Sequence, residues 1–171
     1  MKHIFLIGFM GTGKSTVAAY IHKQYGMEVI EMDDRIAEKE SMSIPDIFSR
    51  YGEEYFREAE TNLLISLQNK QGCVVSCGGG VILRRQNVEI MKRKGHIVLL
   101  TAKPETILAR VKNDVNRPLL SGKKNVAAIR DMMDARYDKY VEAADVLIET
   151  DGKAAEVICK EIFKKIDTVG E

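Results

Sequence analysis

Short apolar segments rich in Val and Ile alternate along the chain with longer segments that have an amphipathic, helical pattern. Short apolar runs of this kind are typical of strands that helices cover on both faces. Strands that alternate with helices indicate a parallel sheet with right-handed crossover connections. The predicted strands cover residues 3–8, 28–32, 73–77, 96–101 and 145–150, and the predicted helices cover 14–25, 34–40, 44–51, 53–70, 84–94, 104–112, 125–143 and 153–167.

The alternation extends over 171 residues without an internal repeat, a low-complexity tract or a Pro/Gly-rich linker. It therefore predicts a single three-layer α/β domain over residues 1–171. Residues 113–125 (NDVNRPLLSGKKN) interrupt the pattern, because they contain Pro, Gly and several polar residues without clean periodicity. Such a segment is either a plain surface connection or, as is common for loops of this length, a lid over a binding site.

Composition gives no sign of a nucleic-acid partner or a membrane partner. The formal net charge is +1, so no bulk field favours nucleic acid or an anionic membrane. No run approaches the roughly 18 apolar residues of a membrane-spanning helix, and no signal sequence is evident. Cys73, Cys77 and Cys159 lack Cys-x-x-Cys spacing, so we expect buried reduced thiols rather than a disulfide or a zinc site. We expect a cytoplasmic monomer with no nucleic-acid or membrane partner.

The most specific chemical signal is the phosphate-loop segment Gly8–Thr16 (GFMGTGKST), which lies between a predicted strand and a predicted helix. Its Gly-x4-Gly-Lys-Ser spacing is the Walker A pattern. Glycines let successive N–H groups curl around a phosphate, and the helix N-terminus adds its positive end. Lys14 would reach the β- and γ-phosphates, and the Ser15 hydroxyl would ligate the Mg²⁺ that bridges them. The segment predicts binding of a nucleoside triphosphate.

Two classes of function use such a loop, a phosphotransferase and a non-catalytic nucleotide-binding switch. A guanine-binding switch would carry an Asn-Lys-x-Asp element after a strand. The nearest match here, NKQG at 69–72, precedes a strand and lacks the aspartate, and no Asp-x-x-Gly element closes the second predicted strand. These differences favour the phosphotransferase.

Acidic residues follow the second predicted strand. Side chains alternate along a strand, so we expect Glu31 and Asp33 to face the ligand side while Asp34 points away and either caps or begins the next helix. Carboxyl ends of parallel strands are where such sheets bind ligands. The two acids are therefore candidates to hold a Mg²⁺-bound water and an acceptor hydroxyl, although one of them can instead be a simple helix cap.

Two further features lie between the second and fourth predicted strands. Arg57 and Glu60 are three residues apart on a predicted helix, which suits either a surface ion pair or an anion-binding arginine oriented by an acid. Gly78–Gly80 directly follow the third predicted strand. A flexible turn is one interpretation, but three consecutive glycines favour close approach of backbone N–H groups to a ligand.

In combination these segments resemble the shikimate kinase family, small P-loop kinases of the nucleoside monophosphate kinase fold. The resemblance covers nearly the whole chain and implies transfer of the ATP γ-phosphoryl group to the 3-hydroxyl of shikimate in aromatic amino-acid biosynthesis, with sheet order 2-3-1-4-5. The alternative is a sibling kinase for another hydroxy acid, such as gluconate, or for a nucleoside monophosphate. The shared segments are GFMGTGKST, the acids at 31 and 33, GEEYFREAE at 52–60, the triple glycine, NRPLL at 116–120 and MDARYDKY at 133–140.

The resemblance also implies roles for individual residues. Lys14, Asp33 and the lid residue Arg117 would be catalytic, and Ser15 would bind the Mg²⁺ that accompanies ATP. Glu31 stands where the family usually has aspartate, and we expect it to meet the Mg²⁺ shell through water. ATP would be bound by Gly11, Thr12, Gly13, Lys14, Ser15, Thr16, Arg117 and Lys153, with Arg110 nearby, and shikimate by Asp33, Arg57, Gly79, Gly80 and Arg136. The two arginines suit its carboxylate because a guanidinium forms bidentate hydrogen bonds.

Overall fold

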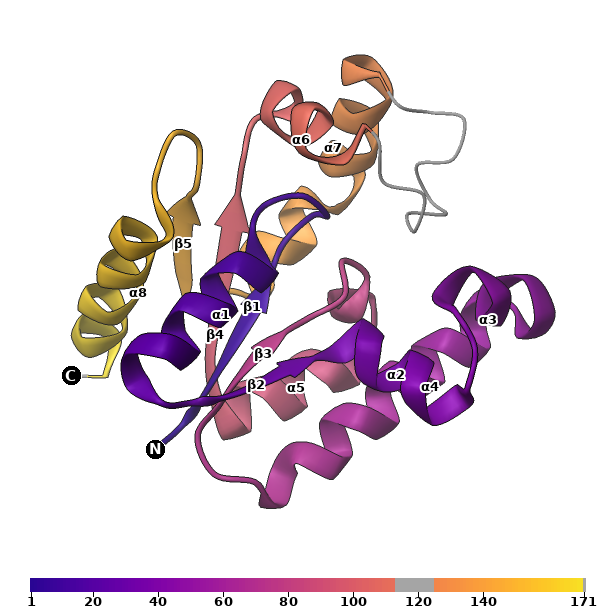
Figure 1. Ribbon diagram of the computed structural model, residues 1–171, viewed down its shortest axis with the longest axis horizontal. Helices are drawn as coiled ribbons and strands as arrows, with labels where there is room; N and C mark the ends of the chain where they lie inside the picture. The colour runs from indigo at the N-terminus through magenta and orange to yellow at the C-terminus, as the bar shows by residue number, and fades with distance from the viewer. Residues whose placement is uncertain (113–124, 171) are drawn as a thin grey trace.

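The computed structural model describes residues 1–112 and 125–170, and at its centre is a five-stranded parallel sheet (Figure 1). The strand order β2-β3-β1-β4-β5 confirms the α/β class and the predicted topology. The predicted strand boundaries are correct to within one residue. The strands are β1 (His3–Ile7), β2 (Glu28–Glu31), β3 (Cys73–Ser76), β4 (Gly95–Thr101) and β5 (Val146–Glu149).

The helices also follow the predicted pattern, and two of them, α1 and α3, have the predicted bounds. Ser43 caps α3 by accepting a hydrogen bond from the Asp46 N–H, with Pro45 in the first turn. The described helices are α1 (Lys14–Tyr25), α2 (Met32–Glu40), α3 (Ile44–Tyr51), α4 (Glu53–Ser66), α5 (Arg85–Lys94), α6 (Pro104–Val111), α7 (Val126–Ala143) and α8 (Ala155–Val169), with short 3-10 helices η1 (Leu67–Asn69) and η2 (Val81–Leu83).

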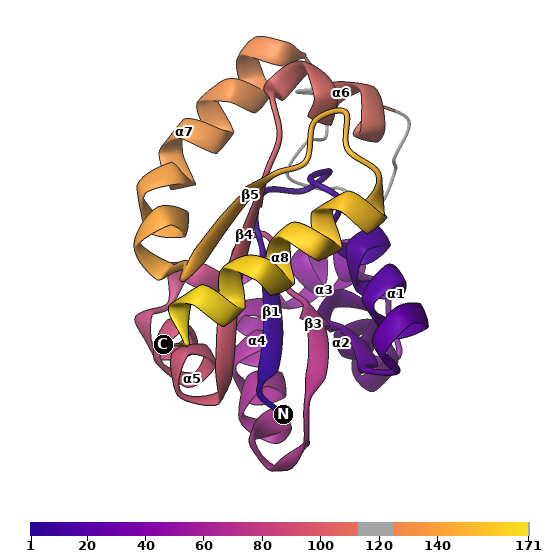
Figure 2. The same ribbon diagram turned by 90° about the vertical axis from the view of Figure 1, so that its left-hand side faces the viewer.

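Strand alternation divides the core between the two faces of the sheet. Ile4 and Leu6 of β1 pack with Val17 and Ile21 of α1 and with α8, whereas Phe5 and Ile7 face α4, α5 and α7. Figure 2 shows α1 and α7 on opposite sides of the sheet. Burial on both faces explains why the strands read as continuous apolar runs. The thiols of Cys73, Cys77 and Cys159 are free and buried, as predicted.

The central strands β1 and β3 position the two segments that carry the candidate chemistry. They pair in parallel with Leu6 opposite Ser76, and the Cys77 N–H donates to the Leu6 carbonyl at 3.0 Å. The phosphate loop follows β1 and the triple glycine follows β3, so the two segments leave the same edge of the sheet side by side. None of the helices in the described ranges is long and apolar enough to cross a membrane.

One predicted element boundary has consequences for the site. β2 ends at Glu31, and α2 begins at Met32, so Asp33 and Asp34 lie in the first helical turn rather than on a strand. The strand-alternation argument for Glu31 and Asp33 is therefore wrong. Acidic residues are favourable in a first turn because they oppose the positive end of the helix dipole.

Candidate active site

The phosphate loop has the left-handed backbone that its glycines permit. Gly8, Gly11 and Gly13 have φ angles of 142°, 78° and 98°, a range that residues with a Cβ rarely adopt. A Cβ on Gly11 would lie 2.8 Å from a methyl of Val111, so this glycine is also required by packing against α6. The loop is thus shaped by backbone geometry and contacts that the sequence pattern encodes directly.

Polar side chains fasten the loop to its surroundings. The Lys14 ammonium donates to the carbonyls of Gly8 and Phe9 at 2.7 and 3.1 Å, and the buried Thr12 hydroxyl donates to Phe9 at 2.8 Å. The Ser15 hydroxyl donates to a Glu31 carboxylate oxygen at 3.0 Å. We expected Glu31 to meet the metal shell only through water, but its carboxylate contacts the serine that is expected to ligate the metal.

A cavity of about 880 Å³ extends from the phosphate loop across the ends of β1 and β3 to α2 and α3. Such a volume accommodates a nucleotide and a small second substrate. Most of the predicted nucleotide residues border it, together with residues that were not predicted. Its lining includes Gly11, Thr12, Gly13, Lys14, Ser15, Thr16, Glu31, Asp33, Asp34, Ser76, Gly78, Gly79, Arg110, Thr150 and Lys153.

Asp34 does not have the orientation predicted for it. The residue lies in the first turn of α2 and lines the cavity, and the N-cap position of that helix is Glu31, which makes no side-chain cap hydrogen bond. Asp33 also lines the cavity, and its Oδ1 atom would lie 3.0 Å from a Cβ placed on Gly78. Asp33 thus reaches the predicted place by starting a helix, and Asp34 borders the same cavity.

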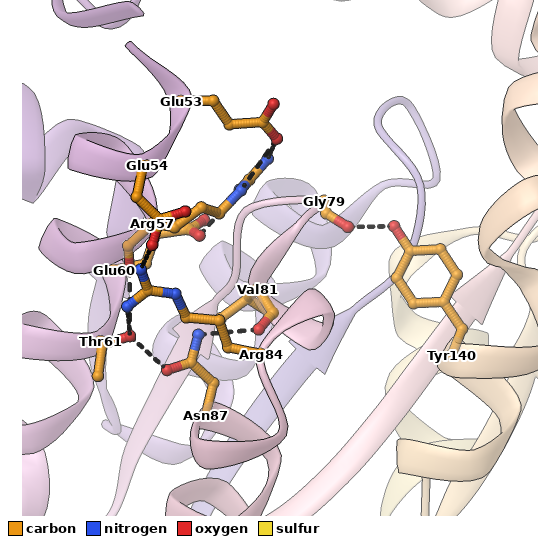
Figure 3. Close-up of polar contacts among 10 residues, drawn as sticks. All are labelled: Glu53, Glu54, Arg57, Glu60, Thr61, Gly79, Val81, Arg84, Asn87 and Tyr140. Carbon is orange, nitrogen blue, oxygen red and sulfur yellow. Dashed lines mark hydrogen bonds and ion pairs between the residues drawn. The ribbon is translucent and has the colours of Figure 1, made fainter. Parts of the chain in front are cut away.

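Arg57 and Glu60 form a buried ion pair, which excludes the surface alternative (Figure 3). Arg57 Nη1 donates to Glu60 at 2.9 Å, and Nη2 donates to Glu53 at 3.0 Å. Burial raises the pKa of the Glu60 carboxyl to about 7, although the charge of Arg57 opposes this. Burial acts to lower the pKa of Arg57, but Glu60 and Glu53 outweigh it and raise that pKa.

The triple glycine, which we call the glycine turn (Gly78–Gly80), is required by contacts within the protein. A Cβ on Gly78 would lie 2.7 Å from Glu60 Oε1, and a Cβ on Gly80 would overlap the Arg57 guanidinium. A Cβ on Gly79 would make only ordinary contacts, the nearest at 3.6 Å from the Tyr140 hydroxyl. Two of the three glycines are thus explained by the buried side chains of α4 rather than by access for a ligand.

Arg136 approaches the glycine turn from the opposite side, on α7. Its Nη1 atom is buried, has no hydrogen-bond partner, and would lie 3.7 Å from a Cβ on Gly79. Three of the predicted site residues that the structure describes do not line the cavity, namely Arg57, Gly80 and Arg136. The two predicted carboxylate-binding arginines are therefore brought to one turn next to the cavity, with a buried guanidinium nitrogen available on Arg136.

The remaining predicted residues lie near the nucleotide end or outside the described ranges. Arg110 Nη1 donates to the Gly11 carbonyl at 2.9 Å, and Lys153 forms an ion pair with Glu161 at 2.9 Å. Arg117 and almost all of the predicted lid lie outside the described residues. Sequence reasoning missed Thr150, whose hydroxyl donates to the Thr12 carbonyl at 3.0 Å and thereby fixes the loop to the end of β5.

A strand, a phosphate loop, a helix and a cavity at the carboxyl edge of a parallel sheet define a P-loop nucleotide-binding protein. A family model described as "Shikimate kinase" matches residues 10–167. The chain therefore belongs to the shikimate kinase family. It is 41% identical over 166 residues to the shikimate kinase of Sulfurihydrogenibium sp. (strain YO3AOP1), with 97% of this chain and 98% of that one covered. The shikimate kinase of Geobacter sulfurreducens is 41% identical over 161 residues, with coverages of 94% and 88%.

Solved structures agree with this assignment. The chain superposes on the shikimate kinase from Acinetobacter baumannii in complex with shikimate with a TM-score of 0.92 and 35% identity, covering 98% of this chain and 94% of that one. A gluconokinase from Sinorhizobium meliloti matches with a TM-score of 0.57 and 15% identity, covering 98% and 93%. The second likeness shows the fold alone, so the gluconate alternative gains no support beyond a shared architecture.

Proposed function

We propose that this chain transfers the γ-phosphoryl group of ATP to the 3-hydroxyl of shikimate. The observation that carries the proposal is that the nucleotide-binding residues and the acceptor-binding residues lie next to each other. The phosphate loop and Asp33 border one cavity, and the guanidinium groups of Arg57 and Arg136 contact the glycine turn beside it. Family membership over nearly the whole chain supports the choice of acceptor.

The acceptor end suits a molecule that carries a carboxylate and hydroxyl groups. Arg57 and Arg136 supply cationic forks for the carboxylate, and Asp33 accepts a hydrogen bond from the hydroxyl to be phosphorylated. The buried Nη1 of Arg136 provides a donor that a bound carboxylate would satisfy. Binding at both ends would direct the 3-hydroxyl toward the phosphate loop.

In the transfer step, the acceptor oxygen bonds to the γ-phosphorus while the bond from phosphorus to the β–γ bridging oxygen breaks, and ADP leaves. The hydroxyl proton passes to Asp33 late in the transfer and then to solvent. Lys14 neutralises charge that develops on the phosphates. The family resemblance implies the same role for Arg117, which lies outside the described residues. The protein thus contributes positioning and charge neutralisation.

The residues next to the phosphate loop fit Mg²⁺, which prefers oxygen ligands. Ser15 Oγ would be a direct ligand, and the Glu31 carboxylate at 3.0 Å and the Ser76 hydroxyl at 3.5 Å lie beside it. Groups of three or more His, Cys, Asp or Glu side chains that could hold a metal by themselves do not occur in the described part of the chain. When bound there, Mg²⁺ would supply positive charge that stabilises the phosphates during transfer.

The test is ADP release measured with shikimate, quinate, gluconate and nucleoside monophosphates as acceptors, with the product identified by ³¹P NMR. We expect turnover with shikimate and formation of shikimate 3-phosphate. Turnover with gluconate or a nucleotide and none with shikimate would overturn the proposal. We also propose that the enzyme acts as a cytoplasmic monomer, and sedimentation velocity tests the oligomeric part.

A binding experiment tests the acceptor residues separately. Arg136→Ala should weaken shikimate binding by roughly 10- to 100-fold, because a charge-assisted contact contributes about 1.5–3 kcal/mol. Binding of an ATP analogue should stay within about twofold. Unchanged shikimate affinity in calorimetry would remove Arg136 from the acceptor site.

A further inference from the structure

Two adjacent residues of the glycine turn each lie close to one of the two arginines. Gly80 packs flat against the Arg57 guanidinium on the α4 side, so closely that a Cβ there would overlap it. Gly79 packs near Arg136 Nη1 and the Tyr140 hydroxyl on the α7 side. The position of the turn therefore determines how far apart the two guanidinium groups can lie.

On the α7 side, the Tyr140 hydroxyl donates a hydrogen bond to the Gly79 carbonyl (Figure 3). Tyr140 is 3% exposed and follows Arg136 by four residues, so both side chains lie on one face of α7. Burial raises the pKa of the Tyr140 phenol, which therefore stays protonated and able to donate near neutral pH. Nothing in the transfer chemistry above uses this residue.

On the α4 side, a buried network leads from the Arg57 backbone to the residue after the glycine turn. The Thr61 hydroxyl lies 3.1 Å from the Arg57 carbonyl and 2.8 Å from Asn87 Oδ1. Asn87 Nδ2 donates to the Val81 carbonyl at 2.9 Å. Thr61 is 2% exposed and Asn87 is fully buried, so water does not compete for these hydrogen bonds.

We propose that Tyr140, Thr61 and Asn87 are positioning residues that hold the glycine turn between α4 and α7 and so set the separation of Arg57 and Arg136 for the acceptor carboxylate. The inference rests on the proposed function, because it concerns the same acceptor site. It differs in assigning a role to three side chains that need not touch either substrate.

The physical reason is that a bidentate carboxylate contact tolerates little displacement. A shift of about 1 Å in a positioned group can reduce the rate by roughly a hundredfold. The turn has no side chains of its own to pack. Its Gly78 and Gly80 carbonyls accept backbone hydrogen bonds from Val81 and Leu83, and the flanking side-chain hydrogen bonds add rigidity to these. Loss of either flank would let the turn relax toward one helix and change the spacing of the arginines.

The first variant is Tyr140→Phe, which removes the hydroxyl and keeps the ring. We expect the Kd of shikimate measured by calorimetry to rise by roughly 5- to 30-fold, as for one lost buried hydrogen bond. The Kd of ADP and the shape of the unfolding transition should change little. The matched control is Tyr137→Phe, the same chemical change on the same helix at a half-exposed position, which should leave both constants unaltered.

The α4 flank is tested at Thr61, because Asn87 is fully buried and its replacement endangers folding. Thr61→Val keeps the shape and removes the hydroxyl, whereas Thr61→Ser keeps the hydroxyl. We expect weaker shikimate binding in the valine variant and affinity within about threefold of the unaltered chain in the serine variant. A purely structural role would instead lower both shikimate and ADP affinity in proportion to lost stability.

The outcomes separate this inference from the proposed function. If the unaltered chain neither binds nor phosphorylates shikimate, the proposed function fails and the inference fails with it. If the unaltered chain binds shikimate and Tyr140→Phe and Thr61→Val bind it equally well, the inference alone is overturned. Equal losses for shikimate and ADP in these variants would also overturn it.

Discussion

Arg57 Nη1 lies 2.9 Å from Glu60 Oε2, one helical turn away on α4, and both side chains are almost completely sealed from solvent. An exposed pair at this spacing contributes little, but a buried pair becomes costly when one partner is removed, by about 3–5 kcal/mol. The pair therefore orients Arg57, and replacement of either partner should destabilise the fold. Burial also raises the pKa of the Glu60 carboxyl to about 7.

We predict that Glu60 makes folding stability depend on pH. Its pKa is raised from 4.5 to about 7 in the folded state, so the folded state binds the proton more tightly than the unfolded state. The resulting stabilisation is present below pH 4.5 and is lost as the pH rises through 7. Glu60→Gln removes this titration, so the free energy of unfolding of the unaltered chain minus that of the variant should decrease from pH 5 to pH 8.

Urea unfolding at four pH values measures this difference. Glu38→Gln makes the same chemical change at an exposed position of α2 and is the control. A difference for Glu60→Gln that is flat or that increases with pH would mean that Glu60 stays ionised throughout.

We predict that alanine lowers stability at Gly80 but hardly changes it at the adjacent Gly79. Gly80→Ala forces the Arg57 guanidinium away from its place, which should cost about 1–3 kcal/mol of stability and weaken shikimate binding at least tenfold. Gly79→Ala meets its nearest contact at 3.6 Å and should change stability by no more than about 0.5 kcal/mol. Thermal unfolding and calorimetry on both variants check this, and equal stabilities would contradict the close approach at Gly80.

We predict that Asp33 and not Asp34 serves the acceptor hydroxyl. Both lie in the first turn of α2, so each Asp→Asn change removes a similar helix-dipole contribution of about 0.3–1 kcal/mol. Each variant is thus the stability control for the other. Turnover should fall at least a hundredfold in Asp33→Asn and stay close to normal in Asp34→Asn. An inactive Asp34→Asn beside an active Asp33→Asn would reassign the acceptor contact.

We predict that Lys14→Met lowers kcat by roughly 100- to 1000-fold, the usual effect of removing one donor to developing charge. The ammonium also donates to Gly8 and Phe9, so we expect a small loss of thermal stability. Lys23→Met, an exposed lysine on the same helix, should change neither quantity. Near-normal kcat for Lys14→Met in a coupled assay would argue against a catalytic phosphate loop.

The sequence predicted the phosphate loop and the parallel α/β sheet well, because local glycine spacing and strand–helix alternation encode them, whereas the correct strand order came from the family resemblance. It failed at Asp33 and Asp34, since no helix-start or strand-breaking residue in the sequence shows that β2 ends at Glu31. It attributed Gly78–Gly80 to close approach of a ligand, whereas Glu60 and Arg57 occupy the space beside Gly78 and Gly80. Tyr140 and Asn87 were not identified, because their partners are distant in sequence and only the tertiary fold reveals them.

The pairing of β1 with β3 has a consequence for how this protein can vary. The phosphate loop follows β1 and the glycine turn follows β3. Leu6 is paired with Ser76 close to the ends of these two strands. A slip of one residue would displace donor and acceptor by about 3.3 Å, which is comparable to the roughly 3–3.5 Å separation of reacting atoms. Insertions or deletions within either strand should therefore abolish phosphoryl transfer even where the sheet still forms, whereas length changes after α8 should be tolerated.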